Sequence, residues 1–347
     1  MIKISMDGPT SRGRDAQTPF NDGFLSVCST AVREILYHLP PKIFDDIQEL
    51  RIRQGKPINI QCREGEYFAT ASGEITDNHL AAYRVDRDDV QRIFQNITRN
   101  SVYALDEELR NGYITIPGGH RVGFTGEAVL AKGRLQSLKN ISFINIRVSR
   151  EVRGCADTVM PFLIDPSLNN PYHTLIISPP KCGKTTLLRD IIRQLSNGIH
   201  SLGFSGINVG LVDERSEIAA CHHGLPQNDV GVRTDVLDKC PKAEGMYMLV
   251  RSMAPQVIAT DELGKSEDIP AVEEAINAGI KLITTVHGTD VEDIMKRPVL
   301  KKLLQEKLFE RILILSRRRG AGTIEAVVDG RSGTKVKGIT QRRGDQK

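Results

Sequence analysis

A nine-residue loop in the second half of the chain has the composition of a binding site for a triphosphate. The apolar run 174–177 leads into it, and the apolar positions after it recur at the spacing of a helix face. Backbone N–H groups at the start of a helix carry partial positive charge, so a loop between a strand and a helix can hold the negative charges of ATP. The predicted nucleotide-binding residues are Ser178, Pro179, Pro180, Lys181, Cys182, Gly183, Lys184, Thr185 and Thr186.

Individual positions of this loop have distinct chemical tasks. Gly183 lets the backbone approach a phosphate closely, because glycine has no side chain. We expect Lys184 to bridge the β- and γ-phosphates and the Thr185 hydroxyl to ligate Mg²⁺. Glycine usually opens this pattern, whereas this chain has Ser178. A serine is strained if that position requires a positive φ, so the sequence predicts a slightly re-angled loop and leaves the effect on turnover open.

Hydrolysis also needs carboxylates at the ends of neighbouring strands, one to hold Mg²⁺ and one to orient the attacking water. The small and apolar run 257–260 ends in Asp261 and Glu262, which places them at the sheet edge where such folds bind ligands. We assign Asp261 to Mg²⁺ through a water and Glu262 to polarising the nucleophilic water. Glu214 ends another strand, where capping of the next helix is the competing interpretation. His287 ends a third strand and is placed to sense the γ-phosphate, although a lone histidine is more often structural.

The elements around these residues divide the chain into two halves of different type. In the second half, apolar strand-like runs alternate with helical patterns, which predicts a mostly parallel sheet flanked by helices on both faces. The first half mixes helical stripes, at 28–50 and 86–97, with alternating strand patterns. We therefore predict an α+β N-terminal domain followed by an α/β P-loop NTPase domain of the RecA/AAA-like type. The predicted boundaries are a flexible leader over 1–23, the two domains over 24–152 and 153–330, and a basic flexible tail over 331–347.

The composition is that of a folded protein with about two domains. Of the 347 residues, 39% are apolar and 26% are charged, which excludes a disordered or collagen-like chain. The net charge is only 47 − 43 = +4, and the chain has no Trp and 10 + 7 = 17 Phe and Tyr residues, so we expect no nucleic-acid partner. No apolar run reaches the roughly 18 residues of a membrane helix, and the N-terminus lacks the apolar core of a signal sequence. The sequence therefore predicts a cytoplasmic protein.

Longer stretches between about residue 49 and residue 288 resemble a known family. They read LRIRQGKP, GGHRVGFTGE, INIRVSREV, the phosphate loop, VDERSEIA, LPQNDVGVRTDVLDKCPKAEGMYMLVRSMAPQVIATDELG and TTVHG. These segments resemble the stage III sporulation protein AA family of endospore-forming bacteria, a branch of the type II/IV secretion ATPases. By this resemblance Glu214 is similar to the acidic-box residue, Glu262 to the second acidic motif and His287 to the histidine-box residue, so all three are candidate catalytic residues.

The resemblance also implies an assembly and a location. Secretion ATPases of this kind work as homohexamers that bind ATP between the two domains and receive arginines across a domain or subunit interface, where a planar cation can stabilise the transferred phosphoryl group. A surface arginine paired with a nearby acid is the alternative for each candidate. The candidate arginines are Arg121, Arg147, Arg150, Arg233 and Arg251. The family further implies peripheral docking, by integral membrane proteins, on the mother-cell side of a channel complex that links mother cell and forespore.

The leading hypothesis is a Mg²⁺-dependent ATPase that powers or gates this channel complex. A nucleic-acid-associated motor or loader is one alternative, and it would be supported by single-stranded DNA that binds at physiological salt and stimulates ATP turnover. The other alternative is a nucleotide-binding scaffold with little turnover. It would be supported by a Glu262→Gln variant that behaves like the parent.

Overall fold

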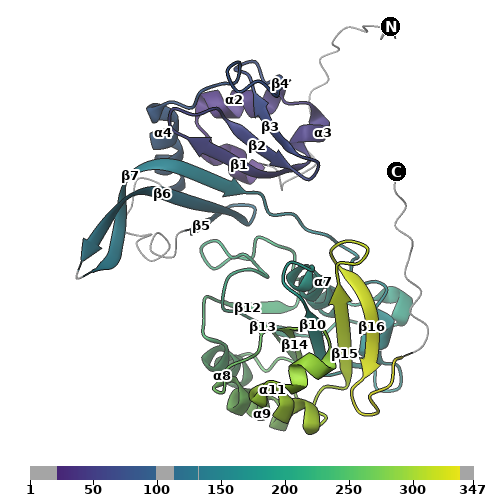
Figure 1. Ribbon diagram of the computed structural model, residues 1–347. Coiled ribbons are helices and arrows are strands. Elements are labelled where there is room, and N and C mark those ends of the chain that lie inside the picture. The colour runs from purple at the N-terminus through teal and green to yellow at the C-terminus, as the bar shows by residue number, and fades with distance from the viewer. Residues whose placement is uncertain (1–21, 99–112, 132, 337–347) are drawn as a thin grey trace, which may run out of the picture. The chain divides into compact units, whose positions relative to one another are not determined.

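The chain divides into two compact units, Met1–Ser149 and Arg150–Lys347, and each has its own apolar core. The computed structural model describes residues 22–98, 113–131 and 133–336 (Figure 1). Residues 1–21 of the predicted leader and 337–347 of the predicted tail lie outside the described residues. Asp22 and Gly23, the last residues of the predicted leader, already belong to the first helix.

The first unit is built on a seven-stranded sheet in the order β4-β3-β2-β1-β7-β6-β5, in which every neighbouring pair is antiparallel. Apolar residues of α1, α2 and α4 share one buried cluster with residues from this sheet. Ser29 accepts a hydrogen bond from the Val32 N–H and so caps the start of α2. The elements are α1 Asp22–Val27, α2 Thr30–His38, α3 Pro41–Phe44, β1 Ile47–Arg53, β2 Asn59–Cys62, β3 Glu66–Ala69, β4 Ile75–Thr76, α4 Arg87–Thr98, β5 Tyr113–Ile116, β6 His120–Ala131 and β7 Arg134–Arg147.

The second unit is built on a seven-stranded sheet in the order β12-β11-β13-β14-β10-β15-β16. All neighbouring pairs are parallel except β15 and β16, so the prediction of a mostly parallel sheet is confirmed. The elements are α6 Met160–Leu163, β8 Ile164–Asp165, β9 Asn170–Pro171, β10 Thr174–Ser178, α7 Lys184–Asn197, η2 His200–Leu202, β11 Val209–Asp213, β12 Thr234–Asp238, α8 Lys242–Ser252, β13 Val257–Glu262, α9 Asp268–Asn277, β14 Lys281–His287, α10 Val291–Met295, α11 Pro298–Gln305, β15 Arg311–Ser316 and β16 Thr323–Asp329.

Helices cover both faces of this sheet, as the sequence predicts. Side chains of a strand point alternately to its two faces, and β10 follows that rule. Ile176 lies in the apolar cluster that contains α6 and α7. Leu175 and Ile177 lie in the cluster that contains α8, α9 and α11, which Figure 1 shows together on one side of the strands. Burial on both faces explains why these strands are continuous apolar runs. Within the described residues, no helix is both long and apolar enough to cross a membrane.

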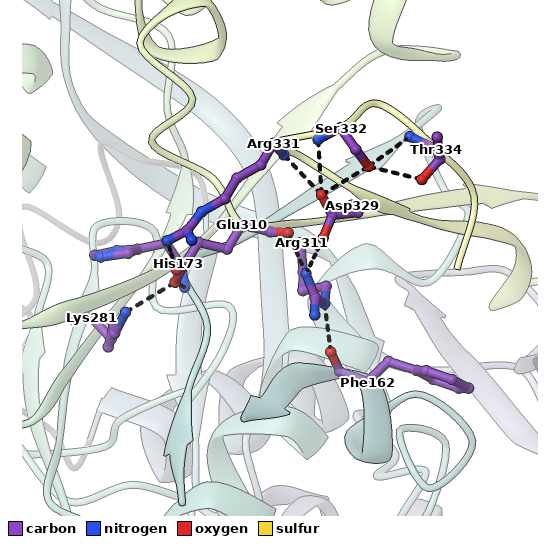
Figure 2. A network of polar contacts seen from close by, with 9 residues as sticks. All are labelled: Phe162, His173, Lys281, Glu310, Arg311, Asp329, Arg331, Ser332 and Thr334. Carbon is purple, nitrogen blue, oxygen red and sulfur yellow. Dashed lines mark hydrogen bonds and ion pairs between the residues drawn. The ribbon is translucent and has the colours of Figure 1, made fainter. Parts of the chain in front are cut away.

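A network of polar contacts lies where the parallel strands of the same sheet begin (Figure 2). We call this end of the strands the amino edge, and the end that carries the phosphate loop the carboxyl edge. The Glu310 carboxylate, only 8% exposed as a residue, accepts from the backbone N–H of His173 at 3.1 Å, from Lys281 Nζ at 2.9 Å and from the Arg331 guanidinium at 2.6 Å. His173 Nδ1 accepts from the Leu282 N–H at 3.1 Å. Burial of the ring lowers the pKa of His173 to about 4, so the imidazole is neutral at pH 7. These bonds tie the starts of β10, β14 and β15 together.

Arg311 forms the other half of the network. Its guanidinium donates to the Phe162 carbonyl oxygen at 3.0 Å and to Asp329 Oδ2 at 2.7 Å, and it stacks over the Tyr172 ring at 3.9 Å. Backbone hydrogen bonding from Ser332 holds the pKa of Asp329 below its usual value. The network therefore fixes the open end of the β15–β16 hairpin, where β15 begins and β16 ends.

The network also holds part of the segment that the sequence assigns to a flexible tail. Arg331 is paired with Glu310, and the Val336 N–H donates to the Val327 carbonyl oxygen at 2.8 Å. Residues 331–336 are therefore bonded to the second unit through both side chain and backbone.

Candidate functional site

The phosphate loop joins the end of β10, at Ser178, to the start of α7, at Lys184. Two residues in between have a left-handed backbone, Lys181 with φ +59° and Gly183 with φ +83°. Ser178 is the last residue of β10 and has no positive φ, and its hydroxyl donates to the Pro179 carbonyl oxygen at 2.9 Å. The strain predicted for a serine at this position is therefore absent, because the left-handed conformation is required two or more residues later.

Glycine at position 183 is required by the neighbouring hairpin as well as by its φ. A Cβ atom there would lie 3.0 Å from the backbone nitrogen of Gly322, in the turn between β15 and β16. The Gly322 N–H donates to the Cys182 carbonyl oxygen at 2.8 Å. The Cys182 residue is 2% exposed, and its thiol donates to the Pro180 carbonyl oxygen at 3.6 Å. The loop thus rests on the hairpin turn.

A cleft of about 290 Å³ opens beside the loop. Ser178 and Pro180 do not line it, because Ser178 is buried within β10 and Pro180 faces solvent. Seven residues of the predicted loop line the cleft together with the three predicted strand-end residues Asp261, Glu262 and His287, and with Arg215 and Glu217, which the sequence did not single out. The seven are Pro179, Lys181, Cys182, Gly183, Lys184, Thr185 and Thr186.

Lys184, Glu262 and His287 form a loosely paired group in this cleft. Lys184 Nζ lies 3.8 Å from Glu262 Oε2 and 3.5 Å from His287 Nε2, and His287 Nε2 lies 3.4 Å from Glu262 Oε2. All three separations exceed the length of an ordinary hydrogen bond. Burial lowers the pKa of the Lys184 amine, while the carboxylates of Glu262 and Asp261 oppose that shift. The group therefore has donors and acceptors that are not saturated by one another.

A bulge in the sheet brings Asp261 and Glu262 to the same cleft. Consecutive residues of a regular strand point to opposite faces, yet both of these acids line it. The β13–β14 register shifts between Ala259 and Glu262, and the Thr284 hydroxyl donates to the Asp261 carbonyl oxygen at 2.8 Å. Such irregularities re-aim side chains at strand ends. His287 reaches the cleft because it lies opposite Ser178 in the β10–β14 pair.

Lys242, at the start of α8, connects Asp261 to Glu214. Its Nζ lies 3.1 Å from Asp261 Oδ1 and donates to Glu214, and its side chain is only 6% exposed. Burial raises the pKa of Asp261, and Lys242 counteracts this. For Glu214, burial opposes ionisation, but the hydrogen bond from Lys242 prevails and its pKa is lowered. Lys265 lies 3.4 Å from Glu214 on its other side.

Glu214 lines an adjacent cleft of about 360 Å³ and not the cleft of the phosphate loop. Glu262 and Arg215 line both. The only sequence signal for Lys242 was its place in the long stretch that carries the family resemblance, because its contacts with both Glu214 and Asp261 depend on β11 and β13 being neighbours in the sheet.

Asp213, the last residue of β11, binds the backbone of a turn and does not cap a helix, since no helix begins between β11 and β12. Its buried carboxylate accepts from the backbone N–H groups of Glu217, Ile218 and Ala219 at 2.8–2.9 Å. Burial raises the pKa of Asp213 to about 6, although these hydrogen bonds oppose the shift. Arg189 of α7 donates to the carbonyl oxygens of Glu217 and Ile218 at 2.7 and 2.6 Å. Both contacts fix the turn that carries Arg215 and Glu217 to the cleft.

Arg233 and Arg251 of the second unit do not line the cleft. Arg233 donates to the Ser196 carbonyl oxygen at 2.7 Å, and Arg251 lies 3.7 Å from Glu274. Both precede the amino ends of strands, the edge opposite the phosphate loop. In the first unit, Arg121 stacks on Tyr113 at 4.9 Å and Arg147 lies 3.5 Å from Glu49, whereas Arg150 begins the second unit. Among the described residues of the second unit, Arg215 is the arginine that lines the cleft.

A mostly parallel sheet with a phosphate loop between β10 and α7, and acids at the ends of neighbouring strands, defines the second unit as a P-loop NTPase fold. The family model described as "Sporulation stage III, protein AA" matches residues 21–336. The chain is 41% identical over 303 residues to "Stage III sporulation protein AA" of Bacillus subtilis (strain 168), covering 87% of this chain and 93% of that protein. The chain therefore belongs to the sporulation stage III protein AA family, and the resemblance read from the sequence is confirmed.

Solved structures to which the chain is similar include two X-ray structures of the ATPase DotB. The Legionella pneumophila protein is 18% identical, with a TM-score of 0.47 and coverage of 77% of this chain and 71% of that chain. The Yersinia pseudotuberculosis protein is 16% identical, with a TM-score of 0.49 and coverage of 95% and 83%.

Proposed function

We propose that this protein is a Mg²⁺-dependent ATP hydrolase whose site is the cleft beside the phosphate loop. The observation that carries the proposal is the group of Lys184, Glu262 and His287, in which a buried lysine at a helix start lies 3.8 Å from a partly exposed carboxylate. A lysine in this place supplies positive charge to phosphates, and a carboxylate at a strand end orients water.

The residues present fit both ATP and Mg²⁺. The left-handed conformations of Lys181 and Gly183 shape a loop at the start of α7, where backbone N–H groups favour an anion. The Thr185 hydroxyl and the Asp261 carboxylate supply the oxygen ligands that Mg²⁺ prefers, and both line the cleft. When bound, Mg²⁺ would neutralise charge on the β- and γ-phosphates.

The remaining residues act on the phosphates and the water. Lys184 attracts the γ-phosphate, and Glu262, with a side chain 30% exposed, accepts a hydrogen bond from a water and polarises it. His287 lies near both Lys184 and Glu262 and is placed to respond to the γ-phosphate. Lys242 holds Asp261 and Glu214 in place, so Glu214 acts through the arrangement of the site in this proposal.

We further propose that the protein acts in endospore formation, as family membership supports. In this proposal it works as a homohexamer, docked by integral membrane proteins on the mother-cell side of a channel complex that it powers or gates. One of the candidate arginines, Arg121, Arg147, Arg150, Arg233 or Arg251, then contacts the nucleotide of a neighbouring copy.

The Lys184→Ala variant tests the proposed function. We expect loss of ATP binding and a phosphate-release rate about 1000-fold below the parent, because removal of one stabilising donor lowers turnover by about 100- to 1000-fold and binding is lost as well. Lys301→Ala, which removes an exposed lysine of α11, is the matched control and should behave like the parent. Undiminished phosphate release by Lys184→Ala, or no release by the parent, would refute the proposal.

A further inference from the structure

We propose that the arginine-rich turn between β15 and β16, residues 317–322, forms the nucleoside side of the nucleotide site, with Arg317 and Arg319 stacking on the base. The proposal rests on the proposed function, because it assigns the second half of the same ligand. The turn reads Arg317-Arg318-Arg319-Gly320-Ala321-Gly322 and lies outside the segments used to predict the site.

The turn is in direct contact with the phosphate loop. The Gly322 N–H donates to the Cys182 carbonyl oxygen at 2.8 Å, and only the missing side chain of Gly183 allows the two backbones to come so close. Cys182 and Gly183 both line the cleft. Figure 1 shows the yellow tip of the β15–β16 hairpin beside α7. A ligand that lies on the loop and extends past it on this side therefore meets the turn.

The order of the strands decides which end of a nucleoside triphosphate lies on which side. β10 lies between β14 and β15 in the sheet. The groups suited to a metal ion and to an attacking water, Asp261 and Glu262 of β13 and His287 of β14, are all on the β14 side of the loop. The γ-phosphate belongs beside those groups. The nucleoside, at the other end of the ligand, then points to the side of β15 and β16.

The turn is braced internally, and all three of its arginines are exposed. Arg318 lies 2.9 Å from Glu325, a side chain of β16, and the Gly320 N–H donates to the Arg317 carbonyl oxygen at 3.0 Å. The Thr323 hydroxyl donates to the Gly320 carbonyl oxygen at 2.8 Å. Arg317 and Arg319 are exposed. A guanidinium group stacks on the flat face of a ring, so a rigid turn with two such groups beside the loop is suited to a purine base.

The test separates the nucleoside from the phosphates. Binding of a non-hydrolysable ATP analogue and of inorganic tripolyphosphate, each with Mg²⁺, is measured by calorimetry for the parent and for Arg317→Ala/Arg319→Ala. We expect the parent to bind the analogue more tightly than tripolyphosphate. The double variant should bind the analogue about 10-fold more weakly, because one stacked base is lost, and should bind tripolyphosphate as the parent does.

A charge-matched control distinguishes stacking from general attraction. Lys296→Ala/Lys301→Ala, which changes two exposed lysines outside the turn, removes two positive charges as well, and it should leave both affinities unchanged. Equal binding of the two ligands by the parent overturns this inference and leaves the phosphate loop in place. So does a double variant that keeps the preference for the analogue, or one that loses affinity for both ligands equally. If the parent binds neither ligand, the proposed function fails and this inference fails with it.

Discussion

The two edges of the second unit's sheet both carry clusters of charged residues, but the clusters differ in how completely they are bonded. At the amino edge, Glu310 accepts from three donors at 2.6–3.1 Å and its side chain is 10% exposed. At the carboxyl edge, Lys184, Glu262 and His287 are separated by 3.4–3.8 Å, and their side chains are 12%, 30% and 38% exposed.

We interpret this difference as one between charges with a structural role and charges available to a ligand. A buried polar network with every group satisfied fixes the elements that it joins. Charged groups that lie near each other at distances longer than ordinary hydrogen bonds can still bind a ligand. Such clusters are typical of functional sites. Lys242 stands between the two cases, since it is buried and closely bonded, yet its partner Asp261 lines the cleft.

The largest predicted effect is a loss of ATPase activity, without a loss of stability, when a residue of the cluster of Lys184, Glu262 and His287 is changed. We expect Glu262→Gln to lower the rate of phosphate release by about 100-fold or more, because a neutral amide cannot polarise the attacking water. The free energy of unfolding should change by no more than about 0.5 kcal/mol, because the lost contacts are long and partly exposed. Glu267→Gln, which removes an exposed carboxylate of the same loop, is the control for both measurements. A Glu262→Gln variant that turns over like the parent would assign the cluster to structure.

The opposite result is expected at the amino edge. Glu310→Gln should lower the free energy of unfolding by about 3 kcal/mol, because Lys281 and Arg331 lose a buried charged partner. Denaturant unfolding measures this change, and Glu273→Gln, whose pair with Lys302 is exposed, should show almost none. Well below the melting temperature, we expect the phosphate-release rate of Glu310→Gln to equal that of the parent. A large loss of phosphate-release rate in a folded Glu310→Gln variant would show that the amino edge, too, contributes to activity, and would contradict the distinction between the two edges.

The smallest predicted effect is a loss of folding stability at acid pH. The folded protein holds the pKa of His173 at about 4, below the ordinary value of 6.5, first through burial and then through Lys281. The unfolded chain therefore binds the proton first as the pH falls, and stability from this group, complete above pH 6.5, is lost between pH 6.5 and pH 4. Because the ring is partly exposed, we expect about 1 kcal/mol from this residue.

Unfolding free energies measured at pH 7 and pH 4.5 check this expectation. His173→Gln should show a shallower decline over that interval than the parent, since it has no proton to take up. Identical declines would mean that the acid sensitivity of the amino edge comes from other groups, such as Glu310.

The phosphate loop could be predicted from sequence because its signal is local. Thr174–Ser178, the glycine at 183 and the lysine at 184 are consecutive, and the strand and helix on either side have their own apolar patterns. The parallel sheet was predictable for a similar reason, as buried strands alternate with helical segments along the chain. The same local view could not decide whether Ser178 needs a positive φ, and the structure shows that it does not, because Ser178 is still part of β10.

Tertiary structure decided the pairings that no local pattern contains. Lys242 meets Glu214 across 28 residues and Glu310 meets His173 across 137, because strands that are distant in sequence are neighbours in the sheet. The contact of Gly322 with Cys182 likewise exists only because β15 lies next to β10. The amino-acid sequence by itself determined the residues that can hold a triphosphate and the class of sheet that presents them. The order of the strands, set by the packing of helices on both faces, determined which charges meet and which stay open to a ligand.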